Sequence, residues 1–220
     1  MRSQATAKET RIYLIRHAEP ALPDSRRRFI GQSNLPLSVS GERRAELLAD
    51  QLKVIRFEAL YSSDLQRCLS TADALSTKIG LPIRHESGLR EMHLGLWEGL
   101  TSEEVSQLYP EEHASWEVDL TGYRVPGGES FRDLQRRVLP VFLRIAGADS
   151  GNILMVSHKG VNRVLLCHFL GLPLKELFAI RQDFCCVNVI RILALPHCHP
   201  QVSVEAQNQQ SLSCSLPAPA

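Results

Sequence analysis

The chain has 220 residues, of which 44% are hydrophobic, and a formal net charge of +1 at pH 7. This length and composition predict one domain with a single sizeable core, and a charge so close to zero predicts no general attraction to nucleic acid or to membrane surfaces. The sequence has no apolar run of the roughly 18 residues that a membrane-spanning helix needs, and residues 1–10 lack the apolar stretch of a secretory signal, so we expect a cytoplasmic protein.

The predicted elements in the first part of the chain alternate between strands and helices. Residues 12–15 form a short apolar run that predicts a buried strand, and residues 42–53 place their apolar side chains at helical spacing. Residues 59–61 predict a second short strand, and residues 64–79 predict a second helix that stops before a glycine.

The middle of the chain is predicted to be helical. Thr101 and Glu104 have the spacing of a capping box, which predicts a short helix that ends before Pro110. Ser130 is expected to cap a longer amphipathic helix, because apolar residues recur at helical spacing after it.

Strands and helices continue to alternate towards the C-terminus. Residues 153–156 predict a third strand, residues 161–170 a helix, and residues 187–193 a fourth strand rich in β-branched side chains. Residues 202–204 are a candidate edge strand.

This alternation predicts an α/β fold, with a three-layer α/β/α sandwich around a mostly parallel sheet. We expect a single domain over residues 1–206. Residues 207–220 are dominated by Gln, Ser and Pro, which predicts a disordered tail.

Charged side chains follow three of the predicted strands directly. The first strand leads into Arg16 and His17, the second into a helix that carries Arg67 in its first turn, and the third into His158. Ligands of open α/β sheets bind beyond the carboxyl ends of the strands, and helix N-termini at the same edge add partial positive charge. The sequence therefore predicts a phosphate-binding crevice.

Several segments carry a more specific pattern. They are residues 14–19 (LIRHAE), 28–31 (RFIG), 61–67 (YSSDLQR), 89–99 (LREMHLGLWEG), 126–130 (PGGES) and 156–158 (VSH). In this order they resemble the histidine phosphatase superfamily, which has the phosphoglycerate mutase-like fold. The resemblance extends over roughly residues 11–204.

The resemblance implies a mechanism through phosphohistidine, with His17 as the nucleophile. One ring nitrogen of His17 would attack while the other holds its proton against an acceptor such as a backbone carbonyl. Arg16, Arg67 and a protonated His158 would surround the phosphate oxygens and supply the positive charge that Mg²⁺ supplies in kinases. We therefore expect no metal and no cofactor.

Glu91 matches the position of the family's proton donor. It would protonate the leaving alkoxide and then deprotonate the water that hydrolyses the phosphohistidine, and a nearby phosphate dianion would favour its protonated form. Glu19 and Glu98 are weaker alternatives for this role.

Four further residues are expected at the substrate rim. Arg28, Ile30 and Gly31 lie in the stretch that resembles the family's phosphate-covering loop, and Lys159 follows the second histidine. The two arginines before Arg28 are expected to be solvated.

A phosphatase is favoured over a mutase of the same family. The expected lid, residues 96–125, has Arg124 as its one arginine and seven acidic residues: Glu98, Glu103, Glu104, Glu111, Glu112, Glu117 and Asp119. A mutase of the glycolytic kind would need basic groups here for the second charged end of its substrate. The family's mutases also carry a tyrosine where this chain has Leu94, and a different pair of residues after the second histidine.

The sequence of residues 89–99 is similar to that of the α-ribazole phosphatases of cobalamin assembly and of their broad-specificity relatives. We expect a small-molecule phosphate ester as substrate, with α-ribazole 5′-phosphate as one candidate, and an acidic lid that repels polyanions. One alternative is mutase-type phosphotransfer. The other is an inactive module that only binds phosphate, but such a module would not need the proton donor that accompanies the nucleophile here. A homodimer is a further expectation.

Overall fold

The computed structural model describes residues 8–194 and 199–211. Their strands form one six-stranded sheet in the order β3-β2-β4-β1-β5-β6. The strands are β1 (Lys8–Arg16), β2 (Ala59–Ser62), β3 (Ile83–His85), β4 (Gly151–Ser157), β5 (Val187–Ala194) and β6 (Gln201–Gln209).

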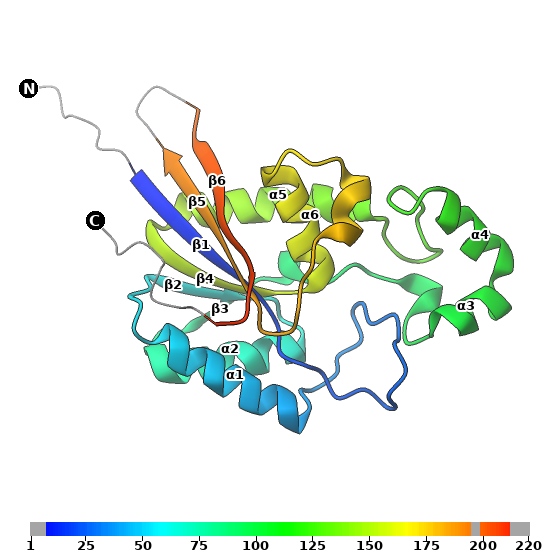
Figure 1. Cartoon of the computed structure of the whole chain (residues 1–220), viewed down its shortest axis with the longest axis horizontal. Coiled ribbons are helices and arrows are strands. Elements are labelled where there is room, and N and C mark those ends of the chain that lie inside the picture. The colour runs from blue at the N-terminus through cyan, green and yellow to red at the C-terminus, as the bar shows by residue number, and fades with distance from the viewer. Residues whose placement is uncertain (1–7, 195–198, 212–220) are drawn as a thin grey trace, which may run out of the picture.

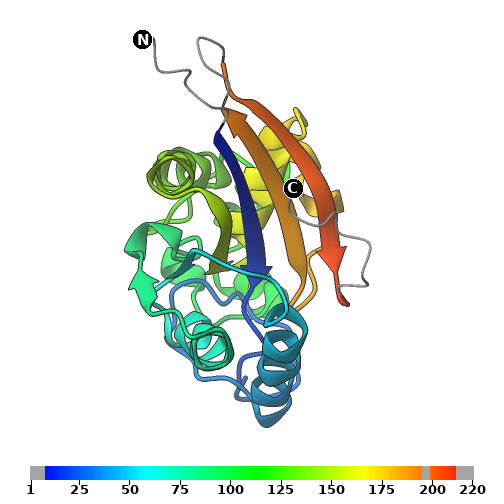
Figure 2. The same ribbon diagram turned by 90° about the vertical axis from the view of Figure 1, so that its left-hand side faces the viewer.

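The sheet is mixed. Strands β3, β2, β4 and β1 pair in parallel, whereas β5 and β6 are antiparallel to their neighbours. Figure 2 shows β1, β5 and β6 side by side on the antiparallel side of the sheet. Because β1 and β4 are in register from Thr10 and Gly151 to Arg16 and Ser157, their carboxyl ends finish together.

Helices cover both faces of the sheet. Helices α1 (Val39–Leu52) and α2 (Gln66–Ile79) lie on one face, and α5 (Phe131–Ala148) and α6 (Lys159–Phe169) on the other (Figure 1). Two short helices, α3 (Ser102–Leu108) and α4 (Pro110–Val118), stand apart from the sheet and form a lid. Three 3₁₀ turns complete the helices: Ser87–Leu89, Gly95–Trp97 and Leu174–Ala179.

Alternating side chains of the strands build two cores. On β1, Ile12 and Leu14 pack towards α5 and α6, whereas Tyr13 and Ile15 pack towards α1 and α2. This follows from the period of two along a strand, which sends successive side chains to opposite faces. The lid has a small cluster of its own around the buried residues Trp97, Val105 and Val125.

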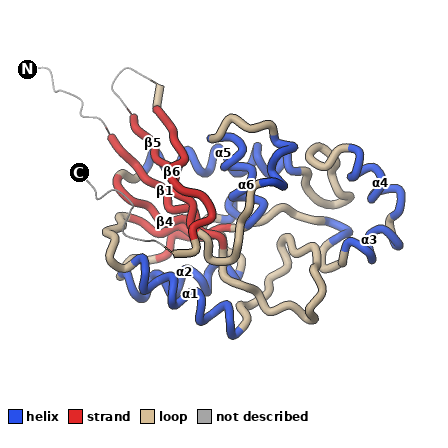
Figure 3. The backbone as a smooth tube through the Cα atoms, viewed as in Figure 1, coloured by secondary structure: helices blue, strands red, loops and turns tan. Residues whose placement is uncertain are grey.

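The loop between β1 and α1, residues 17–38, reaches the lid. Figure 3 shows it in tan below α3. The backbone N–H of Phe29 donates to the carbonyl of Leu100 at 2.7 Å, and Arg28 forms a β-bridge with Thr101. The lid and this loop thus lie side by side over the edge of the sheet where β1 ends.

The predicted α/β sandwich is confirmed, with corrections in detail. Two of the five strand pairings are antiparallel, because residues 170–186 after α6 bring the start of β5 to the edge where β1 ends, and β6 runs antiparallel to β5. Strand β6 runs from Gln201 to Gln209, beyond the predicted 202–204, so residues 207–209 belong to the sheet rather than to a tail. Residues 212–220 lie outside the described residues, and the division at residue 206 otherwise stays a prediction.

The capping box predicted at Thr101 and the helix cap predicted at Ser130 are both confirmed. Thr101 accepts from the N–H of Glu104 at the start of α3, and Ser130 accepts from the N–H of Asp133 at the start of α5. Helix α4 was not predicted, although Pro110 at its first turn is a favourable starting residue. Among the described residues no helix is both long enough and apolar enough to cross a membrane.

The core contribution of α5 can be tested with two neighbouring residues. Phe142 is fully buried, with its ring 4.8 Å from that of Phe169, whereas Leu143 is 50% exposed. We expect Phe142→Ala to lower the free energy of unfolding by about 3–5 kcal/mol, and Leu143→Ala to change it by less than about 1 kcal/mol. Urea denaturation of both variants measures this, and equal losses would contradict the assignment of the core face.

Candidate active site

The three predicted strand ends meet at one edge of the sheet. The N–H of His17 donates to the carbonyl of Ser157 at 2.9 Å, and the N–H of Ser63 donates to the carbonyl of Val156 at 3.0 Å. These bonds continue the parallel ladders one residue past β1 and β2. The side chains that follow the strands therefore converge on a single site, as expected for parallel strands.

The imidazole of His17 is held in one orientation. Its Nδ1 lies 2.7 Å from the carbonyl oxygen of Ala18 and can only donate there, so Nδ1 carries the proton. Nε2 accepts from Nε of Arg67 at 3.2 Å and therefore carries a lone pair. Burial, followed by the charges of Arg67 and Arg16, holds the pKa of His17 well below its usual range. The ring is therefore neutral, with its electron pair on Nε2, as the predicted role of nucleophile requires.

Arg67 links His17 to the loop over the site. Its guanidinium donates to the carbonyl of Ser33 at 2.8 Å and to that of Gly31 at 2.6 Å, besides its bond to His17. The side chain is 1% exposed, and burial lowers its pKa. A buried guanidinium with these partners is a fixed positive charge beside the nucleophile.

Arg16 lies on the other side of His17. Its Nη1 donates to the carbonyl of Gln182 at 2.7 Å, and its Cζ lies 3.7 Å from the centre of the Phe184 ring. Burial lowers the pKa of Arg16 to about 10, so it stays charged at neutral pH. Within the part of the chain that the structure describes, its Nε has no hydrogen-bond partner. Part of this guanidinium is thus left without a partner beside the cavity.

His158 differs from its predicted role. It is fully buried and lies behind His17, with the two ring centres 5.1 Å apart. Its Nδ1 accepts from Arg67 at 3.0 Å, so Nε2 holds the proton and donates to Ser63 at 2.9 Å. Burial and the charge of Arg67 lower its pKa well below the usual range, so the phosphate-free site holds a neutral His158 rather than the predicted cation.

Glu91 is 8% exposed and is oriented by two backbone donors. One carboxylate oxygen accepts from the N–H of Met92 and the other from the N–H of Gly160, each at 2.9 Å. A Cβ at position 160 would lie 2.3 Å from the carboxylate, so only glycine allows this approach. The start of α6 thereby fixes the predicted proton donor.

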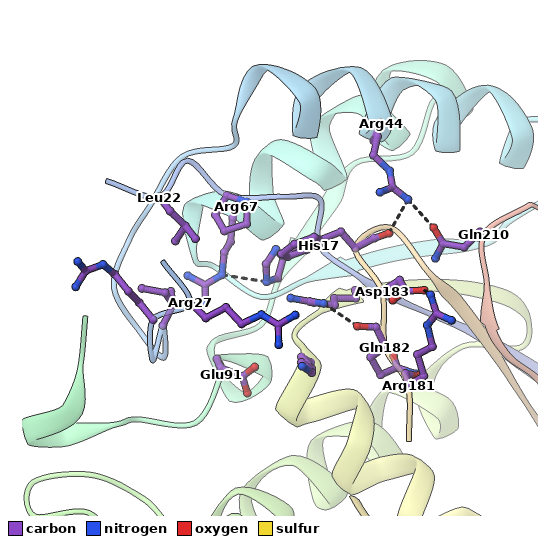
Figure 4. Close-up of a pocket in the computed structure, with 16 residues that line it drawn as sticks. His17, Leu22, Arg27, Arg44, Arg67, Glu91, Arg181, Gln182, Asp183 and Gln210 are labelled. Atoms are coloured by element: carbon purple, nitrogen blue, oxygen red, sulfur yellow. Dashed lines mark hydrogen bonds and ion pairs between the residues drawn. The ribbon is translucent and has the colours of Figure 1, made fainter. Parts of the chain in front are cut away.

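These groups border one cavity of about 780 Å³. Figure 4 shows Arg67 and His17 pointing toward one another, with Glu91 below them. The charged residues of its wall are mostly basic: Arg16, Arg27, Arg28, Arg44, Arg67, Lys159 and Arg181, with Glu91 and Asp183 as the acidic ones. The cavity is suited to an anion.

Two of the four predicted rim residues line this cavity in the expected way. Ile30 and Lys159 are part of its wall. Arg28 also borders it, but its guanidinium is engaged by Asp24 and Glu104 rather than left for phosphate. Gly31 instead has a positioning role, because its carbonyl accepts from Arg67 and its N–H donates to a carboxylate.

The alternative donors Glu98 and Glu19 have structural partners. Glu98 accepts from the backbone N–H groups of Gly31, Gln32 and Ser33, and so holds the loop that Arg67 also contacts. Glu19 accepts from two serine hydroxyls at the start of α1. Both carboxylates are therefore engaged in holding the protein, and neither is among the residues that line the cavity.

Several cavity residues were not predicted. Gln182, Asp183 and Phe184 precede β5, and Gln210 follows β6. Because β5 is antiparallel to β1, its amino end lies at the edge where the parallel strands have their carboxyl ends. The strand-end rule for parallel sheets could not find these residues. Arg27, expected to be solvated, is exposed but also borders the cavity.

Residues 12–195 match the family model of the histidine phosphatase superfamily, branch 1. The chain belongs to this superfamily. The fold is the one that the sequence resemblance implied.

Among curated proteins, the chain is 38% identical over 168 residues to human 6-phosphofructo-2-kinase/fructose-2,6-bisphosphatase 1, covering 76% of this chain and 34% of that protein. The chain thus spans about a third of the length of the curated relatives it matches. Among solved structures, the α-ribazole phosphatase of Shigella flexneri superposes with a TM-score of 0.80 at 26% identity, covering 92% of this chain and 98% of the other. A mycobacterial glucosyl-3-phosphoglycerate phosphatase gives 0.79 at 25% identity, covering 92% and 99%.

The two buried histidines should make stability depend on pH. Their pKa values are lowered in the folded state, so below about pH 6.5 the unfolded chain binds protons that the folded chain does not. We expect the free energy of unfolding to have its full value above that pH. As the pH decreases below it, the free energy of unfolding should fall by up to about 1.4 kcal/mol per pH unit for each histidine. Urea denaturation from pH 7.5 to 5.5 in phosphate-free buffer measures this slope.

His17→Asn should make that slope shallower, because one of the two titrating groups is removed. His85→Gln, a change at an exposed residue of β3, is the matched control and should leave the slope as in the wild type. Equal slopes for wild type and His17→Asn would contradict the burial of a neutral imidazole at this site.

Proposed function

We propose that the chain is a phosphomonoesterase that hydrolyses a small-molecule phosphate ester through a covalent phosphohistidine on His17. The observation that carries this proposal is the tautomer of His17. The bond from Nδ1–H to the carbonyl of Ala18 leaves the lone pair on Nε2, next to the guanidinium of Arg67 and a basic cavity.

In the first step, the Nε2 lone pair of His17 attacks phosphorus and forms the P–N bond. The ester P–O bond breaks, its electron pair goes to the leaving oxygen, and the carboxyl group of Glu91 gives that oxygen a proton. Arg67 and Arg16 face the phosphoryl oxygens, so positive charge is already in place where negative charge shifts. Phosphate esters need on the order of 20 kcal/mol of barrier lowering, and sharing it between two steps is the advantage of a covalent intermediate.

In the second step, the carboxylate of Glu91 takes a proton from water while the water oxygen attacks phosphorus. The P–N bond breaks and its electron pair returns to the imidazole. Inorganic phosphate leaves, Glu91 is again protonated, and the net reaction is ester plus water to alcohol plus phosphate. One carboxyl group serves both steps because the leaving alcohol and the incoming water occupy the same side of phosphorus.

The inner surface of the lid supports a phosphatase over a mutase. Among the described residues of the cavity walls, those from the lid are Trp97, Trp116, Leu120, Tyr123 and Val125, and none of these is basic. A second negatively charged group of a substrate would therefore find no basic side chain on the inner surface of the lid. The placement of Glu91 beside the nucleophile also favours an enzyme over a module that only captures phosphate.

The prediction that an acidic lid repels polyanions finds no support in the walls of the two cavities. None of the seven acidic lid residues is among the described residues that line the cavities. Glu104, for example, closes the capping box of α3 and pairs with Arg26. Its charge is therefore directed to protein partners, whereas the seven basic residues of the first cavity would attract an anion.

The substrate itself is a separate matter. α-Ribazole 5′-phosphate is one candidate, supported by the likeness of the chain to the Shigella flexneri phosphatase. A panel of phosphomonoesters that includes it, phosphoglycerates and sugar phosphates would rank the candidates. The cytoplasmic location and a homodimer stay predictions.

The covalent step can be tested by stopping the reaction in base, where phosphohistidine is stable. Wild-type protein mixed with ³²P-labelled p-nitrophenyl phosphate in EDTA should turn over and carry label that is labile to acid and stable to base. EDTA should not reduce the rate, because arginines supply the positive charge. His17→Ala should lose label and lower kcat by about 10⁴-fold or more. Label that persists in His17→Ala would show that another group is the nucleophile.

The role of Glu91 can be tested through the leaving group. Ethanol leaves poorly without a proton, whereas p-nitrophenolate does not need one. We expect Glu91→Gln to lower kcat/KM about 10²- to 10⁴-fold for ethyl phosphate, and by less than about tenfold for p-nitrophenyl phosphate. Glu103→Gln, at an exposed lid residue, is the matched control and should change neither. Equal losses for both esters would mean that Glu91 is not the donor.

A further inference from the structure

A second cavity of about 250 Å³ opens beside the first, under the lid. The two cavities share Arg28, Ile30, Glu91 and Lys159, whereas His17, Arg16 and Arg67 border only the first. The second cavity therefore joins the site on the side of the proton donor. It does not reach His17 and the two arginines beside it, which are the groups proposed to hold the phosphate.

Six aromatic residues lie in the wall of this second cavity. They are Phe29, Trp97, Trp116, Tyr123, Phe131 and Phe178. Trp97 meets Trp116 edge-on at 5.7 Å and stacks with Tyr123 at 6.0 Å, and Phe131 meets Phe178 edge-on at 5.5 Å. Ring pairs at these distances hold one another in place, so the cavity has a defined shape.

The volume fits a bicyclic ring system. An apolar protein cavity of about 150 Å³ holds benzene, so about 250 Å³ has room for two fused rings. Aromatic walls favour such a guest through apolar burial and through stacked or edge-on contacts.

The arginines of this cavity are already engaged by the protein. Arg163 donates to the carbonyls of Ile180 at 2.9 Å and Phe178 at 3.3 Å, and Arg28 pairs with Asp24 and Glu104. Lys159 and Glu91 lie where the two cavities join. Because both guanidinium groups are directed at protein acceptors, an anionic group placed deep in the second cavity would lose its hydration with little compensation.

We propose that the second cavity is the leaving-group subsite, and that it selects phosphate esters of alcohols that carry an aromatic ring. This inference rests on the proposed phosphatase function. In an in-line displacement the leaving oxygen lies opposite the attacking Nε2, within reach of Glu91. The rest of the alcohol then extends past Glu91 into the aromatic cavity.

A matched series of esters tests the selection in the wild-type protein. Benzyl, 2-naphthylmethyl and 4-carboxybenzyl phosphate are all esters of primary arylmethanols, so their leaving groups have similar acidity. We expect kcat/KM to be about tenfold higher for the naphthylmethyl ester than for the benzyl ester, and at least about tenfold lower for the carboxybenzyl ester. Equal values, or a preference for the anionic ester, would overturn the proposal.

Two arginine substitutions then locate the selection. Leu120→Arg places a cation in the wall of the cavity, and Val118→Arg places the same charge on α4 at a residue that is 89% exposed. Leu120→Arg should lower the kcat/KM ratio of naphthylmethyl to carboxybenzyl ester by about tenfold or more, whereas Val118→Arg should keep the wild-type ratio. Leu120→Gln, closer in size to leucine, should lower the ratio in the same direction if the arginine variant does not fold.

The results separate this inference from the function on which it rests. Failure to hydrolyse any of the three esters would reject the phosphatase proposal and the subsite with it. Hydrolysis of all three at similar kcat/KM, with label still trapped on His17, would reject the subsite alone. A ratio that falls equally in Leu120→Arg and Val118→Arg would assign the selection to overall charge rather than to the cavity.

Discussion

The hydrogen bond from Arg67 to Nε2 of His17 is the contact on which the site depends. A guanidinium cannot accept a proton, so its approach requires a lone pair on that nitrogen and keeps the imidazole neutral. The same side chain holds the backbone of Gly31 and Ser33 and donates to His158. The nucleophile, the loop above it and the second histidine are thus fixed by one buried cation, whose charge also resists protonation of both rings.

The mixed sheet explains how so many groups reach this point. Parallel strands β1, β2 and β4 deliver Arg16, Ser63 and His158 from their carboxyl ends, and antiparallel β5 delivers Phe184 from its amino end. Phe184 covers the guanidinium of Arg16 and lies against the ring of His17. An all-parallel sheet would have placed this residue at the opposite edge.

The lid separates charge from apolar surface. Its carboxylates cap helices, hold the 31–33 loop or face away from the cavities, while its rings turn inward towards Glu91. The composition of the lid predicts an acidic surface facing the substrate, but no acidic lid residue lines either of the two cavities described above. The inner surface of the lid is aromatic, and the selection proposed above depends on these rings rather than on net charge.

The sequence by itself determined the alternation of strands and helices and the caps at Thr101 and Ser130, and it predicted as site residues His17, Arg16, Arg67 and Glu91, which line one cavity. These features follow from local periodicity, from cap chemistry and from motifs that are contiguous in the chain. Only the tertiary structure decided that Arg28 pairs with Asp24, that His158 is neutral and buried, and that residues 207–209 complete a strand. Each of these depends on partners that are distant in sequence or on burial, and neither can be read from the order of residues alone.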